Sequence, residues 1–171
     1  MTSLLTHFIL SFSLCVSSSV LREKLETAGR EMLNNMETTE GARKLEESGS
    51  VLHVLEEGPE GGQRPTASSV VLIHYHGTLP DGSVFDSTMG GEPAKFPLAQ
   101  VIPGWRDGVL NMRVGQTAML GIPPEQAYGA NGTPDGRIPG GATPFFKVRP
   151  VILLFVVPLG RSLGTNNALD L

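Results

Sequence analysis

The stretch VLIHYHGTLPDGSVFDS, residues 71–87, decides the fold of this chain. It begins with an apolar run typical of a β-strand and passes through a Pro-Asp-Gly triplet at 80–82, which favours a tight turn. A second short strand follows the turn. The two strands carry two aromatic residues, Tyr75 and Phe85, and one carboxylate, Asp86.

The rest of the chain after residue 50 continues this strand pattern. Strands are expected at 51–55, 70–79, 83–85, 94–98 and 116–122 and from about residue 143, with one short helix at 104–112. Several antiparallel strands and a single short helix predict an α+β fold.

The composition limits the number of domains and the classes of partner. A chain of 171 residues fits one domain of about 100–130 residues plus an extension. The net charge is −4 and no basic stripe is present, so nucleic acid is not an expected partner. The single cysteine, Cys15, excludes an internal disulfide framework and a cysteine-based zinc site.

The first 18 residues read as a signal peptide. Residues 4–16 are mostly apolar and uncharged, and three serines follow them. The stretch is too short to predict a stable membrane span. We therefore expect an exported protein of the secretory pathway, with the ER lumen, the periplasm or a plastid as destinations. The alternative is a cytoplasmic protein in which this stretch forms a buried or interfacial helix.

A helix is expected at residues 19–37, with Ser19 as its N-cap. Apolar residues recur along it at spacings of three and four: Leu21, Leu25, Ala28, Met32 and Met36. This stripe is too narrow to form a core alone. It docks either on its own domain or on a second copy of the chain, which would make a homodimer through helix 19–37. Residues 38–49 read as a polar linker.

The chemistry available to the folded part points to an apolar binding pocket. Its aromatic residues accompany one carboxylate, with no nucleophile–base pair for covalent catalysis. His74 and His76 share one side of a strand, opposite Tyr75, but no third ligand with suitable spacing appears. No metal or other cofactor is therefore expected.

Ten short segments in fixed order identify a family. They are Val-Leu-Glu-Glu-Gly at 54–58, His-Tyr-His-Gly-Thr-Leu-Pro-Asp-Gly at 74–82, Val-Phe-Asp-Ser at 84–87, Phe-Pro-Leu at 96–98, Val-Ile-Pro-Gly-Trp at 101–105, Val-Gly at 114–115, Ile-Pro-Pro-Glu at 122–125, Ala-Tyr-Gly at 127–129, Ile-Pro at 138–139 and Ala-Thr at 142–143. Together they resemble the FKBP-type peptidyl-prolyl cis–trans isomerases, the macrolide-binding immunophilins. The helix ahead of this domain is similar to that of the extended, Mip-like members.

This resemblance implies an antiparallel sheet wrapped around one short helix, with a pocket between them. It implies catalytic roles for Tyr75, Asp86 and Tyr128. The substrate-binding residues would be Phe85, Phe96, Val101, Ile102, Trp105, Ile138 and Phe146. Trp105 would form the pocket floor, and the Ile102 N–H and the Tyr128 hydroxyl would meet substrate carbonyls. Expected ligands are proline-containing polypeptides and macrolides of the rapamycin type.

The resemblance also implies the reaction, acceleration of X–Pro isomerisation during protein folding without a covalent step. The alternative function is a non-catalytic chaperone or binding module for proline-containing segments. The organisation expected is a signal peptide at 1–18, a helix and linker at 19–47, the isomerase domain at 48–150 and an atypical tail at 151–171.

The last strand departs from the family pattern. Two prolines, Pro144 and Pro150, flank Phe146, and each removes a hydrogen-bond donor that a central strand needs. An apolar run at 151–157 has no counterpart in the family. Either the strand persists and the tail is an appendage, or the C-terminus comes from a mistranslated or mis-spliced end, in which case both stability and activity are reduced.

Overall fold

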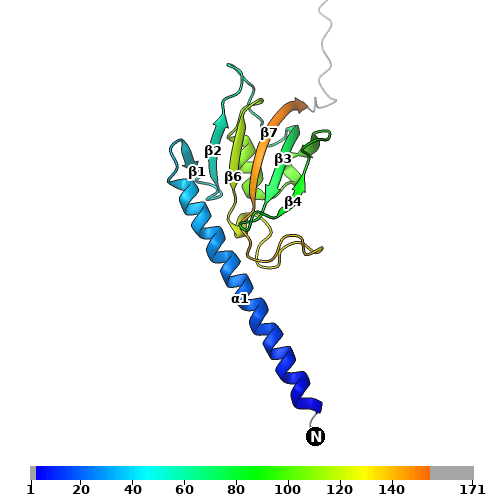
Figure 1. Ribbon diagram of the computed structural model, residues 1–171. Helices are drawn as coiled ribbons and strands as arrows, with labels where there is room; N and C mark the ends of the chain where they lie inside the picture. Colours follow the sequence, from blue (N-terminus) through cyan, green and yellow to red (C-terminus); the bar gives the residue numbers. More distant parts are fainter. Residues whose placement is uncertain (1–2, 155–171) are drawn as a thin grey trace, which may run out of the picture.

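The computed structural model describes the backbone of residues 3–154 and the side chains of residues 19–154 (Figure 1). The elements in chain order are α1 (Ser3–Glu37), β1 (Ala42–Lys44), β2 (Val51–Glu56), β3 (Val70–Thr78), β4 (Val84–Ser87), β5 (Ala94–Pro97), α2 (Pro103–Leu110), β6 (Thr117–Gly121) and β7 (Phe145–Leu154). Two 3-10 turns, Leu98–Gln100 and Pro124–Gln126, precede α2 and follow β6. The expected strands and the short helix are all present, with bounds shifted by a few residues.

All the strands belong to one antiparallel sheet with the order β1-β2-β6-β7-β3-β4, and β5 pairs with the other half of the same β3 edge. The prediction of an α+β fold with an antiparallel sheet around one short helix is confirmed. Helix α2 lies against one face of the sheet, which we call the inner face (Figure 1). The core between them includes Ile73 and Leu120 from the sheet and Val109 from α2.

Strand β3 shows how the sequence pattern places side chains. Its burial alternates, so that Val71, Ile73 and Tyr75 are buried on the inner face. His74 and His76 lie on the opposite face, as predicted. Each histidine ring lies within hydrogen-bonding distance of a hydroxyl, that of Thr88 or Ser87.

Strand β7 is intact despite its prolines and lies between β3 and β6. Pro144 lies just before the strand, and its carbonyl accepts a hydrogen bond from the Ile122 N–H. Pro150 lies at a β-bulge, where the register against β3 shifts, and its carbonyl accepts a hydrogen bond from the Gly115 N–H. A bulge tolerates a residue without an N–H because the ladder is already interrupted there.

The strand therefore persists. It continues beyond residue 150 to Leu154, and its last residues pair with Val70–Leu72. The domain boundary at 150 and the nature of the tail stay predictions. Residues 155–171 lie outside the described residues.

Helix α1 packs on its own domain over the end nearest β1 and β2, and its N-terminal part extends away from the sheet (Figure 1). Gly29 is buried against the domain. A Cβ at this position would lie only 2.6 Å from the Thr143 hydroxyl oxygen, so a larger residue would not fit. Leu33 lies close to Gly121 of β6. Helix α1 thus approaches the domain through a small residue that permits close contact.

One expectation for this helix is wrong: Ser19 is not an N-cap, because α1 begins at Ser3. The predicted apolar stripe docks on its own domain only in part, since Leu25 packs there whereas Leu21 and Met32 are 70% and 40% exposed. Docking of the stripe on a second copy stays a prediction. The side of α1 that contacts the domain contains Gly29 and Leu33, neither of which belongs to the predicted stripe. Within residues 3–154, no helical stretch combines the length and hydrophobicity needed to cross a lipid bilayer.

Candidate functional site

A cavity of about 270 Å³ opens on the inner side of the sheet between α2, β3 and β4. Its lining is mostly aromatic and aliphatic, with a single carboxylate. The lining residues are Tyr75, Phe85, Asp86, Phe96, Gln100, Val101, Ile102, Trp105, Tyr128 and Phe146. Nine of these ten are the residues predicted from the sequence.

The aromatic walls come from separate elements and hold one another in place. The Phe96 ring on β5 lies edge-on to Trp105 of α2, with ring centroids 5.4 Å apart. Phe85 on β4 makes the same kind of contact with Phe146 of β7, also at 5.4 Å. Tyr75 packs tilted against Phe96 at 5.8 Å. Such edge-to-face pairs each contribute about 0.5–1.5 kcal/mol beyond the burial of their area.

Gly77 positions one of these walls, a role that the sequence reasoning missed. It lies on the same side of β3 as Tyr75, and a Cβ at this residue would lie 2.5 Å from the Phe85 ring. The tip of the Phe85 ring can therefore approach the strand this closely only because residue 77 has no side chain. The signal was present in the sequence as a glycine inside a strand pattern.

Asp86 is held in place by Tyr75. The Tyr75 hydroxyl donates a hydrogen bond of 2.5 Å to one carboxylate oxygen, and the Ser87 backbone N–H donates to the other at 2.9 Å. Burial, followed by this hydrogen bond to Asp86, raises the pKa of Tyr75 well above its ordinary value. Tyr75 is therefore a neutral donor at any ordinary pH.

Two donors on residues that line the cavity have no partner among the described residues. The Tyr128 hydroxyl has no hydrogen bond there, and burial raises the pKa of Tyr128. The Ile102 N–H is likewise unused, although the Ile102 carbonyl accepts bonds from Trp105 and Arg106 at the start of α2. Both groups are available to carbonyl oxygens of a bound ligand.

Ile138 is the one predicted site residue that does not line this cavity. It is buried in a small neighbouring cluster with Leu79 and Ala142. There it borders a pocket of about 90 Å³ that also contains Asp135 and Arg137. Hydrogen bonds from Thr133 and then from Arg137 lower the pKa of Asp135 to about 2. Ile138 therefore supports Phe85 and Tyr128 from behind.

Gln100 takes the place of Ile138 in the lining, and sequence reasoning did not find it. It ends the 3-10 turn that leads into Val101. The segment Phe-Pro-Leu-Ala-Gln at 96–100 contains no signal that would have placed its amide at the cavity rim.

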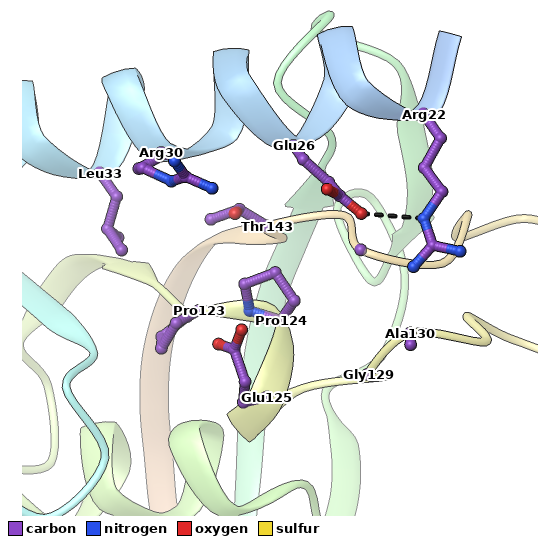
Figure 2. Close-up of a pocket in the computed structure, with 11 residues that line it drawn as sticks. Arg22, Glu26, Arg30, Leu33, Pro123, Pro124, Glu125, Gly129, Ala130 and Thr143 are labelled. Atoms are coloured by element: carbon purple, nitrogen blue, oxygen red, sulfur yellow. Dashed lines mark hydrogen bonds and ion pairs between the residues drawn. The ribbon is translucent and has the colours of Figure 1, made fainter. Parts of the chain in front are cut away.

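A second cavity, of about 310 Å³, lies between α1 and the loop that follows β6. Figure 2 shows Arg22, Glu26 and Arg30 of α1 opposite the Pro123–Glu125 segment. Arg22 and Glu26 form an ion pair of 2.8 Å within the helix. This cavity lacks the aromatic lining of the first. Among the described residues, no group of three or more histidine, cysteine or acidic side chains is placed to hold a metal ion.

This arrangement defines a class: an antiparallel sheet around one helix, with an aromatic pocket between them and a tethered carboxylate at its edge. Comparison with known proteins supports the assignment. Residues 61–150 match the family model described as FKBP-type peptidyl-prolyl cis-trans isomerase. The chain belongs to this family.

Relatives occur in bacteria and in fungi. The chain is 45% identical over 121 residues to the FKBP-type peptidyl-prolyl cis-trans isomerase FkpA of Aeromonas hydrophila, which covers 70% of this chain and 43% of the relative. It is 47% identical over 112 residues to FK506-binding protein 2 of Aspergillus fumigatus, covering 63% of this chain and 75% of the relative. The crystal structure of FkpA from Escherichia coli superposes with a TM-score of 0.71 at 34% identity, covering 90% of this chain and 73% of that one. The chain spans less than half the length of the FkpA sequences it matches.

Proposed function

We propose that this protein accelerates cis–trans isomerisation of X–Pro bonds in polypeptides during protein folding. The observation that carries the proposal is the aromatic cavity with the Tyr75–Asp86 pair at its edge. Family membership supports the same reaction. This chemistry needs no metal ion.

The reaction requires only that the enzyme bind the twisted amide better than the planar one. Rotation breaks amide resonance and faces a barrier of roughly 18–20 kcal/mol. In the twisted state the carbonyl is less polar, so an apolar cavity penalises the planar ground state more than the twisted one. This difference in binding is catalysis without a covalent intermediate.

Each polar group then has a role that does not involve proton transfer. The Ile102 N–H and the Tyr128 hydroxyl donate to carbonyls of the substrate that flank the proline, and Trp105 forms the floor under its ring. Tyr75 holds Asp86 so that its charge faces the rotating carbonyl carbon. Phe85, Phe96, Val101 and Phe146 exclude water.

The alternative, a non-catalytic binding module, depended on a disrupted last strand. Because β7 is intact and Phe146 lines the cavity, that argument no longer favours it. A protease-coupled assay with an Ala-Leu-Pro-Phe peptide distinguishes the two functions. We expect acceleration that rapamycin abolishes. No acceleration by the folded protein, or acceleration that rapamycin leaves unchanged, would refute the isomerase.

The ligand chemistry follows from the same cavity. A macrolide of the rapamycin type fills an aromatic pocket and accepts hydrogen bonds from donors at its rim, as a prolyl peptide does. The name of the Aspergillus relative, FK506-binding protein 2, refers to binding of FK506. We therefore propose that proline-containing polypeptides and such macrolides compete for this cavity.

We further propose that the chain is exported and forms a homodimer through residues 19–37. The proposal of export rests on the apolar, uncharged segment 4–16, whose side chains lie outside the described residues. The dimer rests on Leu21 and Met32, which remain exposed on α1 although the helix docks on its own domain. N-terminal sequencing of the mature protein tests the removal of residues 1–18.

A further inference from the structure

The face of the sheet opposite α2, which we call the outer face, carries an array of cationic and imidazole groups. Strand register places His53, Met119, Lys147 and His76 side by side in a row across β2, β6, β7 and β3. His74 and Arg149 are paired in the neighbouring row. All the histidines among residues 19–154 lie on this face, in a protein whose net charge is −4.

Most of the outer face is open in the part of the chain that the structure describes. Helix α1 covers only one end, where Leu33 and Phe145 lie 2.6 and 2.9 Å from the position that a Gly121 Cβ would occupy. In Figure 1, α2 lies behind the sheet, and no described helix crosses in front of β7 and β3 at the level of the two rows.

Over the second row the face is hollowed into a groove of about 470 Å³, larger than the isomerase cavity. Its lining includes His74, Lys147, Arg149 and the segment Met89–Gly91, which follows β4. The only acidic residue in the lining is Glu56, whose carboxylate accepts a hydrogen bond of 2.9 Å from the Thr117 hydroxyl.

The two strong cations in the groove are not neutralised. Among residues 19–154, the ion pairs join Arg22 to Glu26, Lys44 to Glu37 and Arg137 to Asp135, so neither Lys147 nor Arg149 has an ion-pair partner there. Both side chains are exposed and lie two residues apart on β7. They therefore point to the same side at a spacing of about 6.6 Å.

We propose that this groove binds an extended acidic segment of polypeptide. An extended chain repeats its side chains with the same spacing of about 6.6 Å, so carboxylates at alternate positions can meet Lys147 and Arg149 together. The exposed Met89 side chain, which borders the groove, contacts the residues between them. A lipid surface would need cations on a flat or convex face, whereas these lie in a groove bordered by the Met89–Gly91 segment.

The groove lies close to the isomerase cavity along the chain. Asp86 lines the cavity and Met89 lines the groove, so only Ser87 and Thr88 lie between them in the sequence, and at most about 11 Å of extended chain joins their Cα atoms. An unfolded polypeptide with a proline in the cavity can place an acidic segment in the groove around the edge of the sheet. This step rests on the proposed isomerase function, and such bivalent contact raises affinity without a new contact at the proline.

The first test measures the groove alone, with the full chain and a labelled proline-free peptide of alternating Glu and Ser. Fluorescence anisotropy should show binding of this peptide and none of its Lys-Ser counterpart. Lys147→Glu should weaken the binding by about tenfold, since one attraction becomes a repulsion. The matched control is Lys24→Glu, the same change at an exposed position of α1, and it should leave the binding unchanged.

The second test measures isomerisation of an Ala-Leu-Pro-Phe peptide with and without an acidic extension. The extension should raise kcat/KM about threefold, and Lys147→Glu should abolish this gain without changing the rate on the short peptide.

Equal binding of the acidic and basic peptides, or equal effects of Lys147→Glu and Lys24→Glu, would overturn the proposal even if the short peptide is isomerised. Equal competition by inorganic phosphate or by anionic lipid vesicles would replace it with a general anion site. Failure to isomerise either peptide would instead refute the proposed function, while the anisotropy result still decides the groove.

Discussion

At the scale of single residues, the Tyr75–Asp86 hydrogen bond determines what the pocket can do. A carboxylate that accepts from a buried hydroxyl and from a backbone N–H is fixed in direction. It contributes a localised negative charge to a cavity that is otherwise apolar. Trp105, 5% exposed, instead supplies shape and dry contact area. We therefore expect substitutions at the two residues to weaken ligand binding to different degrees.

We predict that Trp105→Ala weakens rapamycin binding more than Asp86→Asn does. Loss of the indole removes a buried aromatic contact and should weaken binding about a hundredfold, because aromatic anchors are typical binding hot spots. Asp86→Asn keeps the shape and should cost about tenfold. Isothermal titration calorimetry measures both, with Trp105→Phe and thermal unfolding as controls for the fold. The reverse order would show that Trp105 is not the pocket floor.

Tyr75 also predicts a dependence of stability on pH. Its pKa is raised in the native state, so above about pH 10 the native protein retains a proton that the unfolded chain loses. The unfolded state then binds fewer protons, and the free energy of unfolding falls as the pH rises. Below pH 10 this contribution is fully present. Urea titrations from pH 8 to 11.5 should show a steeper decline for the native sequence than for Tyr75→Phe, and parallel curves would contradict the assignment.

The sequence predicted most of this pocket because its residues stand in short segments with fixed spacing. The departures arise where a side chain's direction depends on a loop. Ile138 follows a glycine-rich stretch, and its position behind Phe85 results from the turn around Gly136, which has a φ of 73°. Gln100 lies at the end of a 3-10 turn, where hydrophobic periodicity gives no information about the direction of its side chain.

At the scale of elements, β7 shows that the position of a proline matters more than its presence. Pro150 is tolerated because the register shift against β3 removes the need for its N–H. A register shift between two strands cannot be read from the residues of one strand. The sequence alone therefore could not predict whether β7 would form around Pro150. In α1 the sequence correctly predicted a helix. The side of the helix that contacts the domain is set by Gly29, and a glycine contributes nothing to the pattern of apolar residues from which that side was predicted.

The last residues of β7 belong to the folded core, which a pair of neighbouring substitutions can test. Leu153 is 8% exposed, whereas Ile152 is 46% exposed. Leu153→Asp should lower the free energy of unfolding by at least about 3 kcal/mol, since it loses apolar burial and buries a charge. Ile152→Asp should change it by less than about 0.5 kcal/mol. Equal effects in urea denaturation would mean that β7 ends before residue 151.

At the scale of the whole molecule, the sheet separates two surfaces with different chemistry. The inner face forms the dry aromatic cavity, and the outer face carries the histidines, Lys147 and Arg149. Helix α1 adds a third surface, because it docks through Gly29 and Leu33 and leaves Leu21 and Met32 exposed. The proposed isomerisation, binding of acidic segments and dimerisation thus use separate surfaces and can be changed independently.

Dimerisation through α1 predicts that charges on its exposed apolar side produce monomers. Leu21→Glu combined with Met32→Glu places two carboxylates where a second copy would bury two apolar side chains, and unpaired buried charges are strongly unfavourable. Sedimentation equilibrium should show a dimer for the native chain and a monomer for this variant. Asn34→Glu, at another exposed position of α1, should leave the dimer intact.

The double variant Leu21→Glu, Met32→Glu should keep its activity on a short prolyl peptide, because the cavity contains no residue of α1. A native chain that is monomeric at micromolar concentration would refute the dimer, and loss of activity in a folded variant would show that α1 and the cavity are coupled.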